Sequence, residues 1–258
     1  GIILDLLLSN MNKLAAVFWD VDGTIADTEL CGHRVAFNLA FKDFGLDWIW
    51  DEKKYIDLLK ISGGLNRIIH FRDEIHSNLS DNFCSQLQSK KRSYYKGLIE
   101  SGKIKTRDGV LMLIKELGEL NIDQFIVTTS GRESLEPLLR TSLNSYLKYF
   151  SKTITYEDVR KHKPYPDAYK LAIKLSNQSP SNCISIEDSR IGVMSAKAAN
   201  LKCLLTLPPW INTFNNIYLK ADACVDSLGN KSKDSKLIYG KPLMSKTVDF
   251  SYLTTIIN

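Results

Sequence analysis

Four apolar runs of strand length constrain the fold of this chain more than any other feature. They occupy residues 14–19, 125–128, 183–186 and 202–207, with a weaker fifth candidate at 221–225. The runs are continuous rather than alternating, which is typical of strands covered on both faces. Helical apolar patterns precede the second, third and fourth runs, at residues 110–120, 169–175 and 191–199. This alternation predicts an α/β fold with a doubly wound, parallel, Rossmann-like sheet.

One long segment interrupts that alternation. Residues 26–105 contain helical patterns but no strand-like run. About 80 residues between the first and second strands is too long for a simple crossover connection. We therefore predict a discontinuous α/β core made of residues 1–25 and 106–258, with residues 26–105 inserted as a separate helical domain.

Composition narrows the classes of protein that remain. Apolar residues make up 44% of the 258 residues and charged residues 24%, as in ordinary globular proteins. The five cysteines form no C-x-x-C pair, which favours buried thiols in a reducing compartment. The apolar run at residues 2–8 is too short to span a bilayer and lacks the features of a signal peptide. We therefore expect a cytoplasmic monomer with no membrane partner.

Net charge indicates the kind of partner. The chain carries a formal charge of +5 but shows no nucleic-acid-binding signature. A mildly basic protein of this kind suits an anionic small molecule. We therefore expect a small-molecule partner and no nucleic acid.

The most informative polar motif is Asp20-Val21-Asp22-Gly23-Thr24, which directly follows the first apolar run. Ligands of open α/β sheets bind beyond the carboxyl ends of the strands. Two carboxylates at that place, followed by a glycine that permits a turn, can hold a hard cation and a phosphate together. Taken alone, the motif could also be a turn that ends the strand with solvated acids.

Three further features follow at the ends of strands or in loops. Thr129, with Ser130 and Gly131, can offer a hydroxyl and backbone N–H groups to phosphate oxygens. Lys163 precedes a helix and can neutralise an anion. Glu187 and Asp188 end the third strand and supply oxygen ligands suited to Mg²⁺. Each feature alone reads as a solvated loop, but their order and placement together predict one phosphate-binding and metal-binding site.

These elements resemble the four motifs of the haloacid dehalogenase-like hydrolase superfamily, over roughly residues 14 to 228. The resemblance implies that Asp20 is a nucleophile that forms an aspartyl phosphate. Asp22 would act as general acid and then general base. Thr129 and Lys163 would bind the transferring phosphoryl group.

The same resemblance implies an Mg²⁺ ion. Its ligands would be Asp20, the backbone carbonyl of Asp22, and Asp188, with Glu187 reaching the ion through water. The enzyme class implied is a phosphoric monoester hydrolase. Residues 26–105 would form a cap that selects the substrate.

The cap segment is similar to that of xylulose-1,5-bisphosphate phosphatases of photosynthetic carbon fixation. Residues that carry this similarity and are implied to contact substrate are Glu29, His33, Gly63, Gly64, Arg67 and Lys91. Arg67 and Lys91 would hold the second phosphate, with a cation on a helix surface as the less favoured alternative for each. Leu65 replaces an expected basic residue, and Gly32 reads as an insertion of one residue. The resemblance implies a plastid location if the source is a photosynthetic eukaryote.

Two other functions remain open from sequence. A β-phosphoglucomutase-like phosphotransferase would share the core and the cap position. A non-catalytic module that binds phosphorylated ligands would keep the fold without turnover. The sequence predicts no role for the tail after Leu228.

Overall fold

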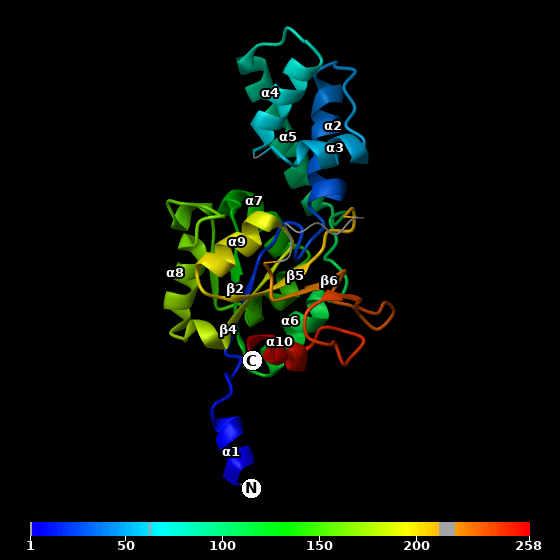
Figure 1. Cartoon of the computed structure of the whole chain (residues 1–258). Coiled ribbons are helices and arrows are strands. Elements are labelled where there is room, and N and C mark those ends of the chain that lie inside the picture. Colours follow the sequence, from blue (N-terminus) through cyan, green and yellow to red (C-terminus); the bar gives the residue numbers. More distant parts are fainter. Residues whose placement is uncertain (1, 62, 212–219) are drawn as a thin grey trace. The chain divides into compact units, whose positions relative to one another are not determined.

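The computed structural model describes residues 2–61, 63–211 and 220–258. Its centre is a seven-stranded sheet in the order β3-β2-β1-β4-β5-β6-β7 (Figure 1). The strands are β1 (Ala16–Trp19), β2 (Asp123–Val127), β3 (Lys152–Ile154), β4 (Cys183–Glu187), β5 (Lys202–Thr206), β6 (Ala223–Val225) and β7 (Leu237–Tyr239). Every neighbouring pair is parallel except β6 and β7. The predicted α/β class and parallel sheet are confirmed, and the weaker fifth candidate is β6.

Helices cover both faces of this sheet. They are α6 (Val110–Glu119), α8 (Asp167–Ser176), α9 (Arg190–Ala198) and α10 (Phe250–Ile257). Helix α7 (Arg132–Arg140) follows the loop after β2, and its residues 137–140 group with residues 27–105. On one face Phe18 and Val127 pack with Tyr169 of α8 and Val193 of α9. On the other face the Trp19 indole donates to Gln124 Oε1. The Gln124 amide in turn donates to the carbonyl of Ile114 in α6. This two-sided burial explains why the strand sequences are continuously apolar.

The tail after Leu228 completes the core. β7 pairs antiparallel with β6 at the edge of the sheet. Helix α10 buries Tyr252, Leu253, Ile256 and Ile257. The tail, for which the sequence predicted no role, therefore contributes an edge strand and a packed helix.

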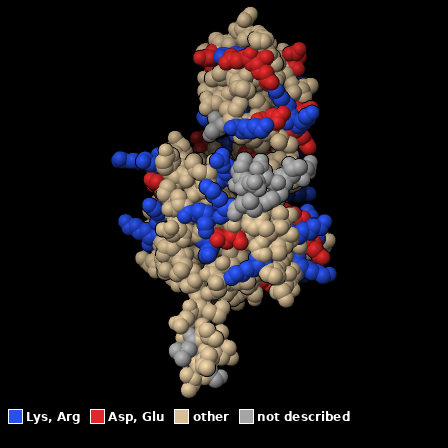
Figure 2. Space-filling view, viewed as in Figure 1, with Lys and Arg blue, Asp and Glu red and all other residues tan. Residues whose placement is uncertain are grey.

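The shorter elements connect or precede the sheet. Three 3₁₀ turns lie at η2 (Asn144–Tyr149), η3 (Tyr156–Asp158) and η4 (Pro180–Asn182). Helix α1 (Ile2–Ser9) precedes β1, and its described side chains are largely apolar and exposed. The described atoms at the N-terminal end of the view in Figure 2 are neither basic nor acidic. In the described part of the chain no helix combines the length and apolarity needed to cross a membrane.

A second compact unit comprises residues 27–105 together with 137–142. The sequence predicts a helical insertion of residues 26–105 and places residues 137–142 in the α/β core. This unit contains a π-helical turn η1 (Glu29–His33), α2 (Arg34–Asp43), α3 (Glu52–Leu58), α4 (Gly64–Glu74) and α5 (Asp81–Glu100). Its interior is aromatic: Phe37, Phe41, Trp50 and Tyr55 are buried and contact one another. The unit has a core of its own, and no strand is found among its described residues.

Candidate active site

The site begins where β1 ends. Asp20 directly follows Trp19, and its backbone N–H donates to the Ile186 carbonyl of β4 at 3.1 Å. Gly23 then turns the chain with φ of +84°, a conformation that favours glycine because it lacks Cβ. The Gly23 N–H donates to the Ala26 carbonyl at 2.8 Å, which closes the turn. Asp20 is thereby fixed at the carboxyl edge of the sheet and is only 8% exposed.

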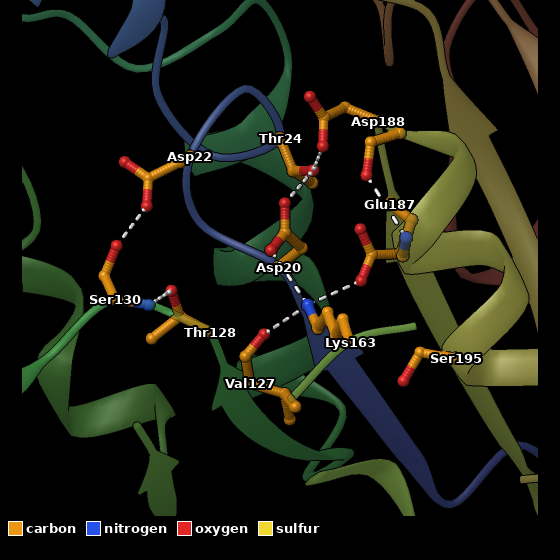
Figure 3. A network of polar contacts seen from close by, with 12 residues as sticks. Asp20, Asp22, Thr24, Val127, Thr128, Ser130, Lys163, Glu187, Asp188 and Ser195 are labelled. Atoms are coloured by element: carbon orange, nitrogen blue, oxygen red, sulfur yellow. Dashed lines mark hydrogen bonds and ion pairs between the residues drawn. The ribbon is translucent and has the colours of Figure 1, made fainter. Parts of the chain in front are cut away.

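Lys163 holds the centre of a buried polar network (Figure 3). Its Nζ lies 2.9 Å from Asp20 Oδ1 and 2.6 Å from Glu187 Oε1, and donates to the Val127 carbonyl at 2.9 Å. Burial alone would lower the pKa of Lys163, but the charges of Asp20 and Glu187 outweigh it and raise that pKa above its ordinary value. The ammonium group therefore stays charged and orients the Asp20 carboxylate.

Two further residues, Tyr169 and Gly192, determine the surroundings of the Glu187 carboxylate. The Tyr169 hydroxyl donates to Glu187 Oε1, and a side chain at position 192 would overlap the Glu187 carboxylate, so Gly192 leaves room for it. Burial and the charge of Asp20 raise the pKa of Glu187 to about 7, against the opposing influence of Lys163. Tyr169 appeared in the sequence as part of an apolar helix stripe, so its polar role was not predicted.

Asp20 also belongs to a cluster of three carboxylates. Asp20, Glu187 and Asp188 each offer an oxygen, and these atoms lie within 4.8 Å of one another. The hydroxyl of Thr24, the last residue of the motif that begins at Asp20, had no predicted role; it lies 2.8 Å from Asp20 Oδ2 and 3.3 Å from Asp188 Oδ1. Burial, then the charges of Asp20 and Glu187, raise the pKa of Asp188 well above its ordinary value.

This donor set fits a hard divalent cation. All its members are oxygens, as Mg²⁺ prefers. Buried carboxylates this close repel one another in the absence of a counter-charge. A cation between them would relieve that repulsion. The predicted metal ligands Asp20, Asp188 and Glu187 therefore lie close enough together to hold one.

Asp22 and Ser130 lie on the side of Asp20 away from Glu187 and Asp188 (Figure 3). The Ser130 hydroxyl donates to Asp22 Oδ2 at 2.6 Å, and the Ser130 N–H donates to Thr128 Oγ1 at 3.0 Å. Strand β2 ends at Val127, so Thr129 is exposed two residues beyond it while Thr128 is buried. The structure thus brings Asp22 and Ser130 together, and Thr128 supports Ser130 in a way the sequence analysis missed.

Glu157 is a further unpredicted group near this loop. Its carboxylate oxygens accept from the Arg132 N–H at 3.2 and 3.3 Å. A side chain at Gly131 would come within 2.9 Å of Glu157 Oε1. The first N–H of α7 therefore already has a carboxylate partner, and Gly131 lies beside that carboxylate.

In the helical unit, the predicted residues His33 and Lys91 lie together. Lys91 is buried on α5, and its Nζ is 2.9 Å from His33 Nδ1 and 4.5 Å from the centre of the Phe37 ring. The His33 ring stacks on Tyr95 with centroids 3.9 Å apart. Lys91 is therefore not a cation of an exposed helix surface.

Arg67 and Glu29, which were also predicted to contact substrate, form hydrogen bonds within this unit. Arg67 Nε donates to the carbonyls of Leu58 and Ile61 at 3.2 and 2.9 Å, so it holds the end of α3. Glu29 accepts from the Tyr55 hydroxyl at 2.6 Å. Gly63 has φ of +87° and precedes α4, which begins at Gly64.

The apparent insertion at Gly32 has a structural counterpart. Residues 29–33 form a π-helical turn, which is how a helix accommodates one extra residue, often near functional sites. A side chain at Gly32 would come within 3.0 Å of Tyr95 and Ile104. Glycine is therefore suited to this position.

Comparison with known proteins identifies the family. The family model of the haloacid dehalogenase-like hydrolases matches residues 17–206. The chain is a haloacid dehalogenase-like hydrolase. Protein CbbY of Rhodobacter capsulatus is 35% identical over 195 residues, which cover 75% of this chain and 86% of that protein. A CBBY-like protein of Arabidopsis thaliana is 30% identical over 231 residues, 85% of this chain and 71% of that protein.

A solved structure extends this similarity to the fold of the hydrolase. A mutant CbbY from Rhodobacter sphaeroides, in complex with xylulose-(1,5)bisphosphate, has a TM-score of 0.72 and 30% identity. The match covers 85% of this chain and 98% of that one. The expected enzyme class, a phosphoric monoester hydrolase, is confirmed by the family and these relatives.

Proposed function

We propose that this hydrolase is an Mg²⁺-dependent sugar-phosphate phosphatase that removes one phosphate from xylulose-1,5-bisphosphate and leaves xylulose-5-phosphate. The reaction type is supported chiefly by the position of Asp20, which is buried at the end of a strand and contacts Lys163 and Thr24. The similarity to a CbbY structure that contains xylulose-(1,5)bisphosphate supports the choice of substrate.

In the first half of the proposed reaction, Asp20 attacks phosphorus in line and forms an acyl phosphate. The bond from phosphorus to the sugar oxygen breaks, and protonated Asp22 gives its proton to that oxygen. The Ser130 hydroxyl, 2.6 Å from Asp22, holds this carboxyl group in place. Lys163 orients Asp20 and neutralises charge on the transferring phosphoryl oxygens, and the Thr129 hydroxyl donates a hydrogen bond to them.

In the second half, the Asp22 carboxylate takes a proton from water. That water attacks phosphorus, the phosphorus–oxygen bond to Asp20 breaks, and inorganic phosphate leaves. Asp20, Asp188 and the Asp22 carbonyl would hold the Mg²⁺ ion, with Glu187 reaching it through water, and the ion would neutralise charge on the phosphoryl group. The acid and base roles of Asp22 distinguish this site from one that cleaves a carbon–halogen bond, which needs no second aspartate.

The helical unit, as the proposed cap, reads the part of the substrate that does not react. Lys91, which is buried and lies 2.9 Å from Nδ1 of the partly buried His33, is the cation of this unit best suited to the second phosphate. Arg67 has its Nε committed to two backbone carbonyls, so only its terminal nitrogens remain for a ligand. Glu29, Gly63 and Gly64 are proposed to contact the sugar, and we propose that the enzyme acts as a monomer in the cytoplasm, or in the plastid stroma of a photosynthetic eukaryote.

A phosphate-release screen over sugar mono- and bisphosphates with Mg²⁺ tests the proposal, with Asp20→Asn as the inactive control. Xylulose-1,5-bisphosphate should give the highest kcat/KM and free inorganic phosphate. Transfer to a second sugar position without free phosphate would instead indicate a phosphoglucomutase-like enzyme. No turnover of any substrate would indicate a binding module.

A further inference from the structure

Arg107 forms a cluster of contacts beside the carboxylate network that no proposed catalytic role uses. Its Nη1 donates to the carbonyls of Gly23 at 2.8 Å and Thr206 at 3.2 Å. Its Nη2 donates to the carbonyls of Leu207 at 2.6 Å and Asp226 at 3.1 Å. Thr206 ends β5 and Asp226 follows β6. One guanidinium therefore ties the carboxyl edges of two strands to the turn that carries the nucleophile.

The contact with Gly23 reaches the metal-binding side of the site. Gly23 has φ of +84°, and a side chain there would overlap the Asp188 carboxylate, so the Gly23 backbone lies directly against that carboxylate. The Gly23 N–H is held by Ala26 and its carbonyl by Arg107. With both ends of the residue fixed, the turn forms a rigid wall for Asp188.

Arg107 is itself anchored by its backbone. The Arg107 N–H donates to the Ile25 carbonyl at 2.8 Å, and the preceding Thr106 pairs with Ala26. An arginine suits this position because its planar fork presents donors in several fixed directions. A lysine ammonium on a flexible stem could not reach all four carbonyls at once.

We propose that Arg107 is a positioning residue that fixes the Gly23 turn and, through it, holds Asp188 in the geometry required for metal binding. This inference rests on the proposed function, because the metal is the Mg²⁺ of that reaction. Groups that support metal ligands from outside typically contribute about 10- to 100-fold to metal affinity.

The experiment measures Mg²⁺ binding to the full chain by titration calorimetry without substrate. Arg107→Met and Arg107→Lys are compared with wild type and with Arg160→Met, which removes an exposed arginine of the same compact unit. We expect the Mg²⁺ Kd to rise about 10- to 100-fold in Arg107→Met, less in Arg107→Lys, and not at all in Arg160→Met. At saturating Mg²⁺, Arg107→Met should recover kcat with a near-normal KM for the sugar phosphate.

Near-ultraviolet circular dichroism of each variant shows whether it is folded. A folded Arg107→Met that binds Mg²⁺ with wild-type affinity would overturn the inference. If Arg107→Met does not fold, Arg107→Lys decides: wild-type affinity refutes the role, and weaker binding supports it. Wild-type protein that binds no Mg²⁺ would instead contradict the proposed function.

Discussion

Replacing Lys163 by methionine tests the electrostatic account of the site. Lys163 Nζ is buried between Asp20 and Glu187, at 2.9 and 2.6 Å from their oxygens. Methionine keeps much of the side-chain volume but leaves two carboxylates buried without their cation. Removing one partner of a buried ion pair costs about 3–5 kcal/mol. We expect the free energy of unfolding at pH 8, measured with EDTA present, to fall by about that amount.

The size of this loss should depend on pH. Burial and Asp20 raise the folded-state pKa of Glu187 to about 7, above its ordinary value of 4.5, although Lys163 opposes this. A carboxyl group whose pKa is higher in the folded state destabilises the fold only when it is ionised. The loss of free energy of unfolding caused by Glu187 is therefore absent below pH 4.5 and reaches its full size above the folded-state pKa of about 7. Without Lys163 that pKa rises further. The stability difference between wild type and Lys163→Met should therefore shrink as pH falls from 8 to 5.

Urea unfolding followed by fluorescence at both pH values measures these differences. Lys197→Met is a matched control, because Lys197 forms a partly exposed ion pair with Asp222 at 2.8 Å. Its free energy of unfolding should fall by at most about 1 kcal/mol. Adding Glu187→Gln to Lys163→Met should recover part of the loss. A loss below about 1 kcal/mol at pH 8, or a larger loss at pH 5 than at pH 8, would refute this reasoning.

Three further predictions concern turnover. Asp22→Asn should lower kcat by about 10²- to 10⁴-fold, because the amide can neither give nor take the required proton; normal steady-state kinetics would exclude Asp22 as the acid and base. EDTA should abolish phosphate release and Mg²⁺ should restore it, so full activity in demetallated protein would remove the metal from the account. Lys91→Met and Arg67→Ala should each lower kcat/KM for the bisphosphate by about 10- to 150-fold, from the 1.5–3 kcal/mol of a charged hydrogen bond. A small monophosphate should be affected much less, and equal losses for both substrates would show that these residues support the fold alone.

Much of the sheet could be predicted from sequence because its central strands are covered on both faces. The runs that overlap β1, β2, β4 and β5 are mainly apolar, since most residues of these strands are buried on both faces. β3 and β7 were missed. Each has only three residues, and two of the three in β3 are exposed, so neither leaves an apolar run as long as those of the central strands.

The site followed from sequence where residues occupy strand ends. Asp20, Glu187 and Asp188 meet because parallel strands bring their carboxyl ends to one edge. Arg107 and Tyr169 were missed because their roles depend on partners far away in the chain. Tyr169 looks like a core residue until its hydroxyl meets Glu187, and Arg107 looks like part of a basic run until it meets four carbonyls. The hydrogen bonds from Arg67 to the end of α3 could not be predicted from the sequence either, since they depend on how α3 and α4 pack.

The central claim is that Asp20 is the nucleophile of a phosphate-releasing enzyme. Its most direct test is the rate of inorganic phosphate release from xylulose-1,5-bisphosphate with Mg²⁺, for wild type and Asp20→Asn. Asparagine keeps the shape of the side chain and removes the attacking charge. The account predicts steady release by wild type and a rate at least ~10³-fold lower for the variant, or about 4 kcal/mol of barrier. Near-normal turnover by pure Asp20→Asn protein would contradict it.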